Sequence, residues 1–170
     1  MKKIIISEYH SPCGLLTLGS YGEKLCLCDW QTGKHGRRVM KRLLRITGAC
    51  IEEGTSPVIE QAMRELDEYF SGTRRTFSVP LLFAGTDFQK RVWEELRAVP
   101  YGTTVSYGEM AVRIGRPKAV RAVANANGAN ALSVFVPCHR VIGTGGMLTG
   151  YAGGLDAKRF LLQLEKSVSV

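Results

Sequence analysis

The chain has 170 residues, of which 45% are hydrophobic and 22% charged, an ordinary composition for a globular protein with one core or two small, closely packed ones. Lys and Arg outnumber Asp and Glu by 23 to 15. This excess is equally compatible with a polyanionic partner and with a basic protein that binds no polyanion. The apolar run from Ile4 to Ile6 is too short for a signal peptide, and no run is long enough to cross a bilayer. We therefore expect a cytoplasmic protein with no membrane partner.

The five cysteines are odd in number and scattered along the chain, so a disulfide framework is not expected and at least one thiol is free. Residues 3–31 alternate and turn like the strands of an antiparallel hairpin or meander. Residues 34–45 contain six basic residues and no acidic one, with apolar residues at helical spacing. They predict an amphipathic helix whose basic face is solvated or, as the second interpretation, binds nucleic acid. A further helix is expected from Ser56-Pro57 to about residue 71.

The second half begins after residues 77–85, which have the composition of a linker or an edge strand. Thr86 or Asp87 can cap a helix that follows over residues 88–99. We predict two domains, residues 1–82 and 83–170.

Residues 105–115 and 116–128 then give helix, glycine turn and helix, the pattern of a helix-turn-helix, with Pro117 near the start of the second helix. That second helix is thin because it is rich in alanine. It suits either close packing against another helix or a narrow minor groove.

The stretch VFVPCHRVIG places Cys138 directly before His139. A cysteine reacts as its thiolate, and near neutral pH it needs a base or a positive charge to form one. Side chains that follow each other in a strand point to opposite faces. We expect Pro137 to end a strand over residues 133–136, so that the thiol and the imidazole converge in a turn, directly or through a water.

Glu165 is the candidate that orients the imidazole of His139. It lies on a predicted C-terminal helix whose packing face is expected to comprise Phe160, Leu161 and Leu164. Taken singly, the cysteine is more often a buried structural thiol and the histidine an ordinary turn residue. Their position together in PCHR favours a nucleophile with its base.

Other cysteine chemistries fit less well. A tyrosine-phosphatase loop would have arginine at position 144, where Thr144 stands, and a papain-like protease would have its base far along the chain. A zinc site lacks paired ligand spacing and stays a minor alternative, and we predict neither a metal nor a cofactor. The zinc candidates weighed here are His10, Cys13, Cys26, Cys28 and His35.

The motif VPCHRVIG, preceded by RAVANANGAN and followed by TGYAGGLDAKRFLLQLE, resembles that of the bacterial O6-alkylguanine-DNA alkyltransferases, also called methylated-DNA–protein-cysteine methyltransferases. The resemblance is tightest over residues 86–165 and looser over the N-terminal half, where SPCGLLTLGS is similar. It implies an α+β fold, in which a ribonuclease-H-like N-terminal α/β domain precedes a mainly helical C-terminal domain with a helix-turn-helix.

The resemblance also implies a DNA repair protein that transfers a methyl or other alkyl group from O6 of guanine, and from O4 of thymine, irreversibly onto its own Cys138. His139 would deprotonate the thiol through a water, with Glu165 orienting the imidazole, and Tyr107 would donate to the departing base. The implied partner is double-stranded DNA, bound by a monomer through the minor groove, with the damaged nucleotide flipped out.

Further roles follow from the same resemblance. Arg121 would fill the gap left by the flipped nucleotide, Asn130 would brace the turn before the cysteine, and the backbone N–H of Ala152 would face O6. The remaining substrate-binding residues implied are Val141, Tyr151, Gly153 and Gly154. Two other classes stay open: a non-catalytic sensor of alkylated bases, and a small cysteine hydrolase that acts on an ester or amide.

Overall fold

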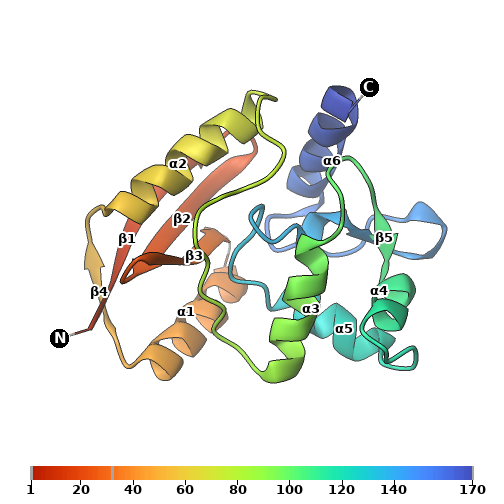
Figure 1. Ribbon diagram of the computed structural model, residues 1–170, viewed down its shortest axis with the longest axis horizontal. Helices are drawn as coiled ribbons and strands as arrows, with labels where there is room; N and C mark the ends of the chain where they lie inside the picture. The colour runs from red at the N-terminus through yellow and green to blue at the C-terminus, as the bar shows by residue number, and fades with distance from the viewer. Residues whose placement is uncertain (1, 32, 170) are drawn as a thin grey trace. The chain divides into compact units, whose positions relative to one another are not determined.

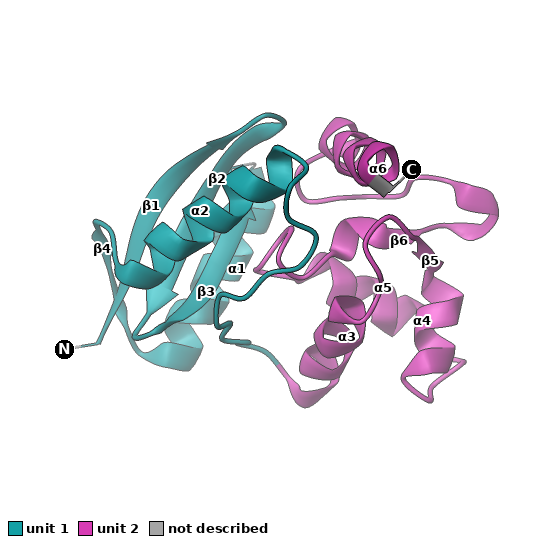
Figure 2. Cartoon of the chain, turned by 45° about the horizontal axis from the view of Figure 1, so that its top comes forward, with its two compact units in different colours: residues 1–85 teal, residues 86–170 magenta. Residues whose placement is uncertain are grey.

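The structure, a computed structural model, describes residues 2–31 and 33–169. It divides into two compact units, residues 1–85 and 86–170 (Figure 2). The first carries a sheet and two helices and the second is mainly helical, as the predicted fold class requires (Figure 1). The domain boundary predicted after residue 82 stays a prediction. Within the described residues, no helix is both long and apolar enough to cross a membrane.

The first unit is built on a four-stranded sheet with the order β3-β2-β1-β4. The first three strands form the predicted antiparallel meander, and the tight turn before β3 has Gly22 at a φ of 61°. After its first residue β3 is buried at every position, so both of its faces are covered. The strands are β1 (Lys3–Ser11), β2 (Gly14–Tyr21), β3 (Lys24–Trp30) and β4 (Cys50–Glu53).

The short strand β4 was not expected from the sequence. All four of its residues are exposed, and Ile51 is the one strong strand former among them, so neither alternation nor hydrophobicity marks it. It exists because its backbone pairs in parallel with residues 3–6 of β1. Such a long-range pairing leaves no local pattern.

Both predicted helices of the first unit are present. The helix α2 (Pro57–Phe70) crosses one face of the sheet (Figure 2) and buries Ile59 and Leu66 completely. Its N-terminus is capped as expected, because the hydroxyl of Ser56 accepts a hydrogen bond from the N–H of Ile59 at 3.2 Å. The helix α1 (Gly33–Thr47) contacts β3 and buries Val39 and Leu43.

In the second unit, α3, α4 and α5 pack together, and the Trp93 indole Nε1 on α3 donates to the Ala126 carbonyl on α5 at 2.8 Å. Thr86, rather than Asp87, caps α3 through a reciprocal capping box with Gln89. The elements are α3 (Asp87–Arg97), β5 (Val105–Ser106), α4 (Tyr107–Arg113), α5 (Val120–Gly128), the 3₁₀ turns η1 (Cys138–Arg140) and η2 (Thr144–Gly146), β6 (Val141–Ile142), and α6 (Leu155–Ser169).

The expected helix, glycine turn and helix are formed by α4, Gly115 and α5. Gly115 has a φ of 76°, a conformation that favours glycine. The second helix was predicted to begin near Pro117, but it begins at Val120. Residues 116–119 instead close a turn in which the N–H of Ala119 donates to the Arg116 carbonyl at 2.9 Å.

The strand predicted over residues 133–136 is wrong, because this segment is a buried turn. The N–H of Val136 donates to the Leu132 carbonyl at 2.8 Å, and Val134 has a φ of 72°. A left-handed conformation is strained for a β-branched residue, so the surroundings must hold it in place. Asn130 does so: its Oδ1 accepts from the N–H of Leu132 at 3.0 Å, and its Nδ2 donates to the Val136 carbonyl at 2.9 Å. A short apolar run does not reveal such a side-chain brace.

Candidate active site

The thiol of Cys138 lies at the start of the 3₁₀ turn η1 and is only 4% exposed. The side-chain amide of Asn130 donates to its Sγ at 3.2 Å, and the N–H of Cys138 donates to the Val136 carbonyl at 2.7 Å. A hydrogen bond donated to sulfur stabilises the thiolate relative to the thiol. The same asparagine that braces the turn therefore also contacts the candidate nucleophile.

The imidazole of His139 is completely buried, with its Nε2 2.7 Å from Glu165 Oε2 on α6. Burial lowers the pKa of His139, helped by the charges of Arg140 and Lys158, and the opposing effect of Glu165 does not overcome this. The imidazole is therefore neutral near neutral pH and able to take up a proton. Its other nitrogen, Nδ1, has no hydrogen-bond partner among the described residues and is the atom available for that proton.

The carboxylate of Glu165 is held from three sides. Arg140 donates twice, from Nε to Oε1 at 2.8 Å and from Nη2 to Oε2 at 3.0 Å, and the N–H of Gly102 donates to Oε1 at 3.3 Å. Burial by itself would raise the pKa of Glu165. The hydrogen bond from His139, with the hydrogen bonds and charge of Arg140, outweighs burial and holds that pKa well below its usual range. Glu165 is thus an anion that fixes the tautomer of His139.

Arg140 and Lys158 are two buried, charged residues of this centre for which the sequence predicted no role. Lys158, on α6, is completely buried, and its Nζ donates to the carbonyls of Val141 at 2.7 Å and Thr149 at 3.0 Å. Burial is also the main cause of its lowered pKa. The signal that could have found it is helical spacing, since Lys158, Leu161 and Glu165 follow one another at intervals of three and four residues.

The packing face predicted for α6 was wrong in part. Phe160 is 37% exposed and Leu164 only half-buried, whereas Leu161 is fully buried as expected. A pattern of hydrophobicity predicts that Phe160, and not a lysine, is buried. In the structure Lys158 is buried instead, because two backbone carbonyls accept hydrogen bonds from its ammonium group.

Tyr107 is the first residue of α4, and its hydroxyl lies 2.9 Å from the Thr149 hydroxyl. The loop that carries Thr149 folds back closely on itself, with the N–H of Gly143 donating to the Met147 carbonyl at 2.8 Å. A Cβ atom at Gly143 would come within 3.0 Å of the Thr149 Cγ2, so any larger residue there would displace the threonine. Thr149 is a further residue of the site that the sequence analysis missed, after Arg140 and Lys158.

The remaining predicted substrate residues lie on the same unit. Tyr151, Ala152 and Gly153 are half-buried in the loop before α6, and Gly154, at a φ of 88°, closes a turn by donating to the Tyr151 carbonyl at 2.9 Å. Arg121 is exposed on α5. Contact of these residues with a substrate stays a prediction, and so do the roles predicted for the other site residues. Among the residues that the structure describes, no three or more His, Cys, Asp or Glu side chains are grouped to hold a metal ion.

Two family models cover nearly the whole chain. Residues 4–83 match the ribonuclease-like domain of 6-O-methylguanine DNA methyltransferase, and residues 87–167 match its DNA binding domain. The chain belongs to the 6-O-methylguanine DNA methyltransferase family. The resemblance on which the expected fold rested is therefore confirmed.

Relatives within this family match over most of their length. The methylated-DNA–protein-cysteine methyltransferase of Methanosarcina acetivorans is 43% identical over 159 residues, which span 94% of this chain and 96% of that protein. The methylated-DNA–protein-cysteine methyltransferase of Haemophilus influenzae is 40% identical over 167 residues, which span 98% of this chain and 88% of that protein. The crystal structure of Mycobacterium tuberculosis OGT in complex with DNA is similar with a TM-score of 0.81 and 42% identity, covering 98% of this chain and 94% of that one.

Proposed function

We propose that this protein repairs DNA by transferring a methyl or other alkyl group from O6 of guanine, and from O4 of thymine, onto its own Cys138. Family membership supports this reaction, and the observation that carries it is the set of contacts around the thiol. The candidate nucleophile has an amide donor on its sulfur, and the neighbouring neutral histidine is held by an ionised carboxylate. This arrangement generates a thiolate in a buried site and needs no cofactor.

The proton leaves Cys138 first. A water bridging the thiol and Nδ1 of His139 carries it to the imidazole, while Glu165 accepts the hydrogen bond from Nε2–H and stabilises the imidazolium that forms. The Asn130 amide stabilises the thiolate that remains. The buried Nδ1 of His139, which has no hydrogen-bond partner within the described part of the chain, supports this position for the water.

Alkyl transfer then forms one bond and breaks another. The thiolate sulfur attacks the alkyl carbon, the bond between that carbon and O6 breaks, and its electron pair goes to the purine. Tyr107 donates a proton to the base and the Ala152 N–H faces O6, so guanine does not leave as a bare anion. The thioether at Cys138 is stable, and each molecule acts once.

Val141, Tyr151, Gly153 and Gly154 line the pocket for the base in this proposal. Double-stranded DNA is bound through the minor groove by α5, on which Ala122 is exposed and Ala124 half-buried, and these small side chains let the helix backbone approach closely. Arg121 takes the place of the flipped nucleotide. The protein acts as a monomer in the cytoplasm.

The deciding experiment is intact mass spectrometry after incubation with a duplex that contains one O6-methylguanine, followed by peptide mapping. We expect a gain of one methyl group on Cys138 that saturates at one per protein, and no gain in Cys138→Ser, which still binds the duplex. An unchanged mass in a folded, reduced sample would disprove the transfer.

The two alternative classes predict different results, one in this assay and one with an ester substrate. A non-catalytic sensor of alkylated bases would bind the damaged duplex with and without Cys138 and would gain no mass. A cysteine hydrolase would turn over an ester repeatedly, and no multiple-turnover activity is compatible with a stable thioether.

A further inference from the structure

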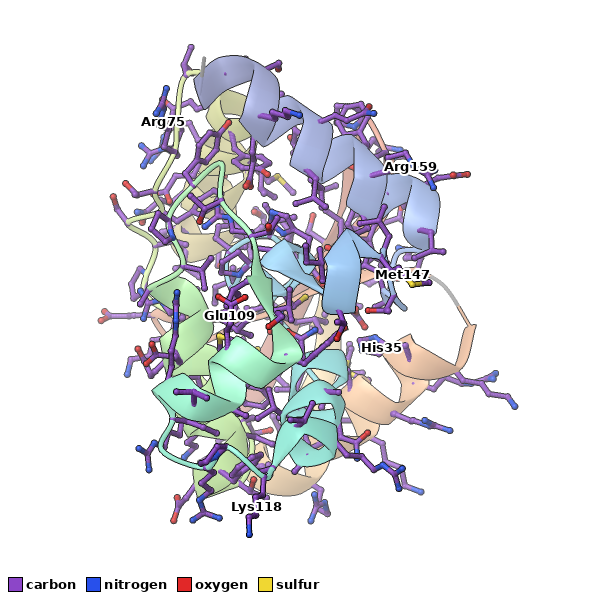
Figure 3. The ribbon with its side chains drawn as sticks, turned by 90° about the vertical axis from the view of Figure 1, so that its right-hand side faces the viewer. His35, Arg75, Glu109, Lys118, Met147 and Arg159 are labelled. Carbon is purple, nitrogen blue, oxygen red and sulfur yellow. The ribbon has the colours of Figure 1, made fainter. Side chains whose placement is uncertain are left out.

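A strongly basic face lies on α1, in the unit that does not contain Cys138. It consists of five exposed residues that the described contacts leave without an ion pair: Lys34, Arg37, Arg38, Lys41 and Arg45. The sixth cation of the helix, Arg42, is turned inward, and its Nε donates to the Ala84 carbonyl at 3.0 Å. Figure 3 shows nitrogen-tipped side chains that extend from α1 away from the body of the protein. We call these five residues the basic face.

The basic face opposes the stability of the helix that carries it. No acidic residue lies in the first turn of α1, and Lys34 with Arg37 and Arg38 places positive charge near the positive end of the helix dipole. The residues of the face also follow one another at intervals of three and four, where like charges repel. A bound polyanion would remove this repulsion, and an ordinary solvated face would more commonly carry both signs.

The helix is nevertheless held firmly from its other side. Val39 and Leu43 are buried, and the Nδ1 of His35 lies 3.1 Å from the Oδ1 of the buried Asp29 on β3. The basic face is therefore displayed on an anchored helix rather than on a loose segment. An anchored row of cations loses less conformational entropy on binding than cations on a mobile segment.

Positive charge is concentrated on this helix within the first unit. Residues 1–85 contain 12 Lys and Arg and nine Asp and Glu, and six of the 12 basic residues lie on α1. The rest of the unit is thus acidic on balance. A protein that needed only solubility or a general positive field would have no reason to gather the charge on one helix face.

We propose that the basic face binds the phosphate backbone of double-stranded DNA, as a contact separate from the helix-turn-helix and independent of base sequence. The choice of DNA among polyanions rests on the proposed function. The face extends about 16 Å from Lys34 to Arg45 along the helix axis. Phosphates of one strand follow at about 3.4 Å of duplex axis each, so the face matches the length of a short run of them.

The test compares two variants that lose the same charge. One neutralises the face, Arg37→Gln with Arg38→Gln and Lys41→Gln. The control neutralises three exposed cations of the same unit outside α1, namely Lys2→Gln, Lys24→Gln and Arg64→Gln. Fluorescence anisotropy then measures affinity for a short undamaged duplex between about 50 and 200 mM salt, where affinity responds to phosphate contacts.

We expect the α1 variant to bind about tenfold or more weakly at the lower salt, with its log–log salt slope smaller by about 2 to 3, because each lost phosphate contact removes about 0.9. The control should change affinity less than about twofold. Both variants should react with free O6-benzylguanine at the wild-type rate, which shows that they are folded. Equal losses in both variants, or no loss in the α1 variant, would overturn the proposal.

The same variants would also reveal whether the basic face binds a polyanion other than DNA. If the α1 variant lost binding to vesicles containing phosphatidylserine and kept its duplex affinity, the face would serve a lipid surface and the DNA proposal would be wrong. Failure of the proposed function appears separately, as a wild-type protein that gains no alkyl group from either the free base or the damaged duplex.

Discussion

Arg140 binds the Glu165 carboxylate with two parallel hydrogen bonds, 2.8 Å from Nε to Oε1 and 3.0 Å from Nη2 to Oε2. Arg140 belongs to the same 3₁₀ turn as Cys138 and His139. The turn that carries the candidate nucleophile and base therefore also carries the cation that fixes their carboxylate. This explains the arginine of PCHR as a positioning residue, buried and bonded through Nη1 to the Val99 carbonyl at 2.8 Å.

Arg140→Met should destabilise the protein and slow alkyl transfer together. It leaves the Glu165 carboxylate buried without its cation, a loss that typically costs about 3 to 5 kcal/mol in the free energy of unfolding. Urea denaturation and single-turnover rates measure both effects. Arg159→Met is the matched control, because Arg159 forms an exposed ion pair with Asp156 and should change little. Equal stability of the two variants would show that Arg140 is not needed to balance Glu165.

The rate of transfer should depend on pH through His139. Burial lowers its pKa below the ordinary value of 6.5, so the base is neutral at pH 6.5 and becomes protonated only at lower pH. We expect the single-turnover rate with a free alkylated base to show no histidine inflection at or above pH 6.5. Below pH 6.5 the rate should decrease as His139 becomes protonated. An inflection above 6.5 that disappears in His139→Asn would contradict a neutral resting imidazole.

The stability of the folded protein should also decrease as the pH falls. Both His139 and Glu165 have lowered pKa values in the folded protein, so the unfolded chain binds their protons first as the pH falls. The contribution of the pair is complete above the ordinary histidine value and is lost in steps below about 6.5 and about 4.5, the ordinary values of the two groups. Urea midpoints measured against pH, for the wild type and for Glu165→Gln, test this. A variant that keeps the wild-type acid sensitivity would argue against Glu165 as its source.

Asn130→Asp should raise the pKa of the Cys138 thiol. The substitution keeps the size of the side chain but replaces the amide donor, 3.2 Å from sulfur, with a carboxylate. We expect this higher pKa to make the transfer rate at neutral pH about tenfold lower. Iodoacetamide reactivity against pH measures the thiol pKa. Asn125→Asp, on the exposed side of α5, makes the same change away from the thiol and should leave the pKa unchanged.

Tyr107 and Thr149 should act as one unit in transfer. The Thr149 hydroxyl holds the Tyr107 hydroxyl at 2.9 Å, and Lys158 fixes the Thr149 carbonyl at 3.0 Å. If Tyr107 is the acid, Tyr107→Phe should slow transfer about 100-fold or more. Thr149→Val should slow transfer by a smaller factor than Tyr107→Phe does, and the double variant should be no slower than Tyr107→Phe alone. Thr149→Ser, which keeps the hydroxyl, should transfer at the wild-type rate. Additive losses in the double variant would show that the two hydroxyls act independently.

Arg121→Ala should weaken binding to duplex DNA more than it slows reaction with a free O6-alkylguanine base. The free base needs no flipping, so an arginine that fills the gap in the duplex is needed only for DNA. Arg113→Ala, an exposed arginine on α4, serves as the comparison. Equal losses of Arg121→Ala with both substrates would rule out the role in flipping.

Local patterns in the sequence were enough to predict most of the elements of the two units. Alternation predicted the meander of residues 3–31, and a serine followed by a proline predicted the start of α2. Glycine after an amphipathic stretch predicted the end of α4. These signals succeed because they act within a few residues of the chain. The adjacent cysteine and histidine of PCHR likewise identified the nucleophile and the base as candidates, the C-terminal helix supplied the candidate carboxylate, and the resemblance then implied their roles.

Tertiary structure alone decided what surrounds those candidates. Residues 133–136 form a turn rather than a strand because a side chain, Asn130, supplies the hydrogen bonds that a neighbouring strand would otherwise supply. Lys158 is buried in place of Phe160 because two carbonyls outside α6, those of Val141 and Thr149, accept hydrogen bonds from its ammonium group. The neutrality of His139 depends mainly on burial, and the ionisation of Glu165 depends on His139 and Arg140, which outweigh burial. Burial and long-range partners exist only after the chain has folded, so a local pattern does not encode them.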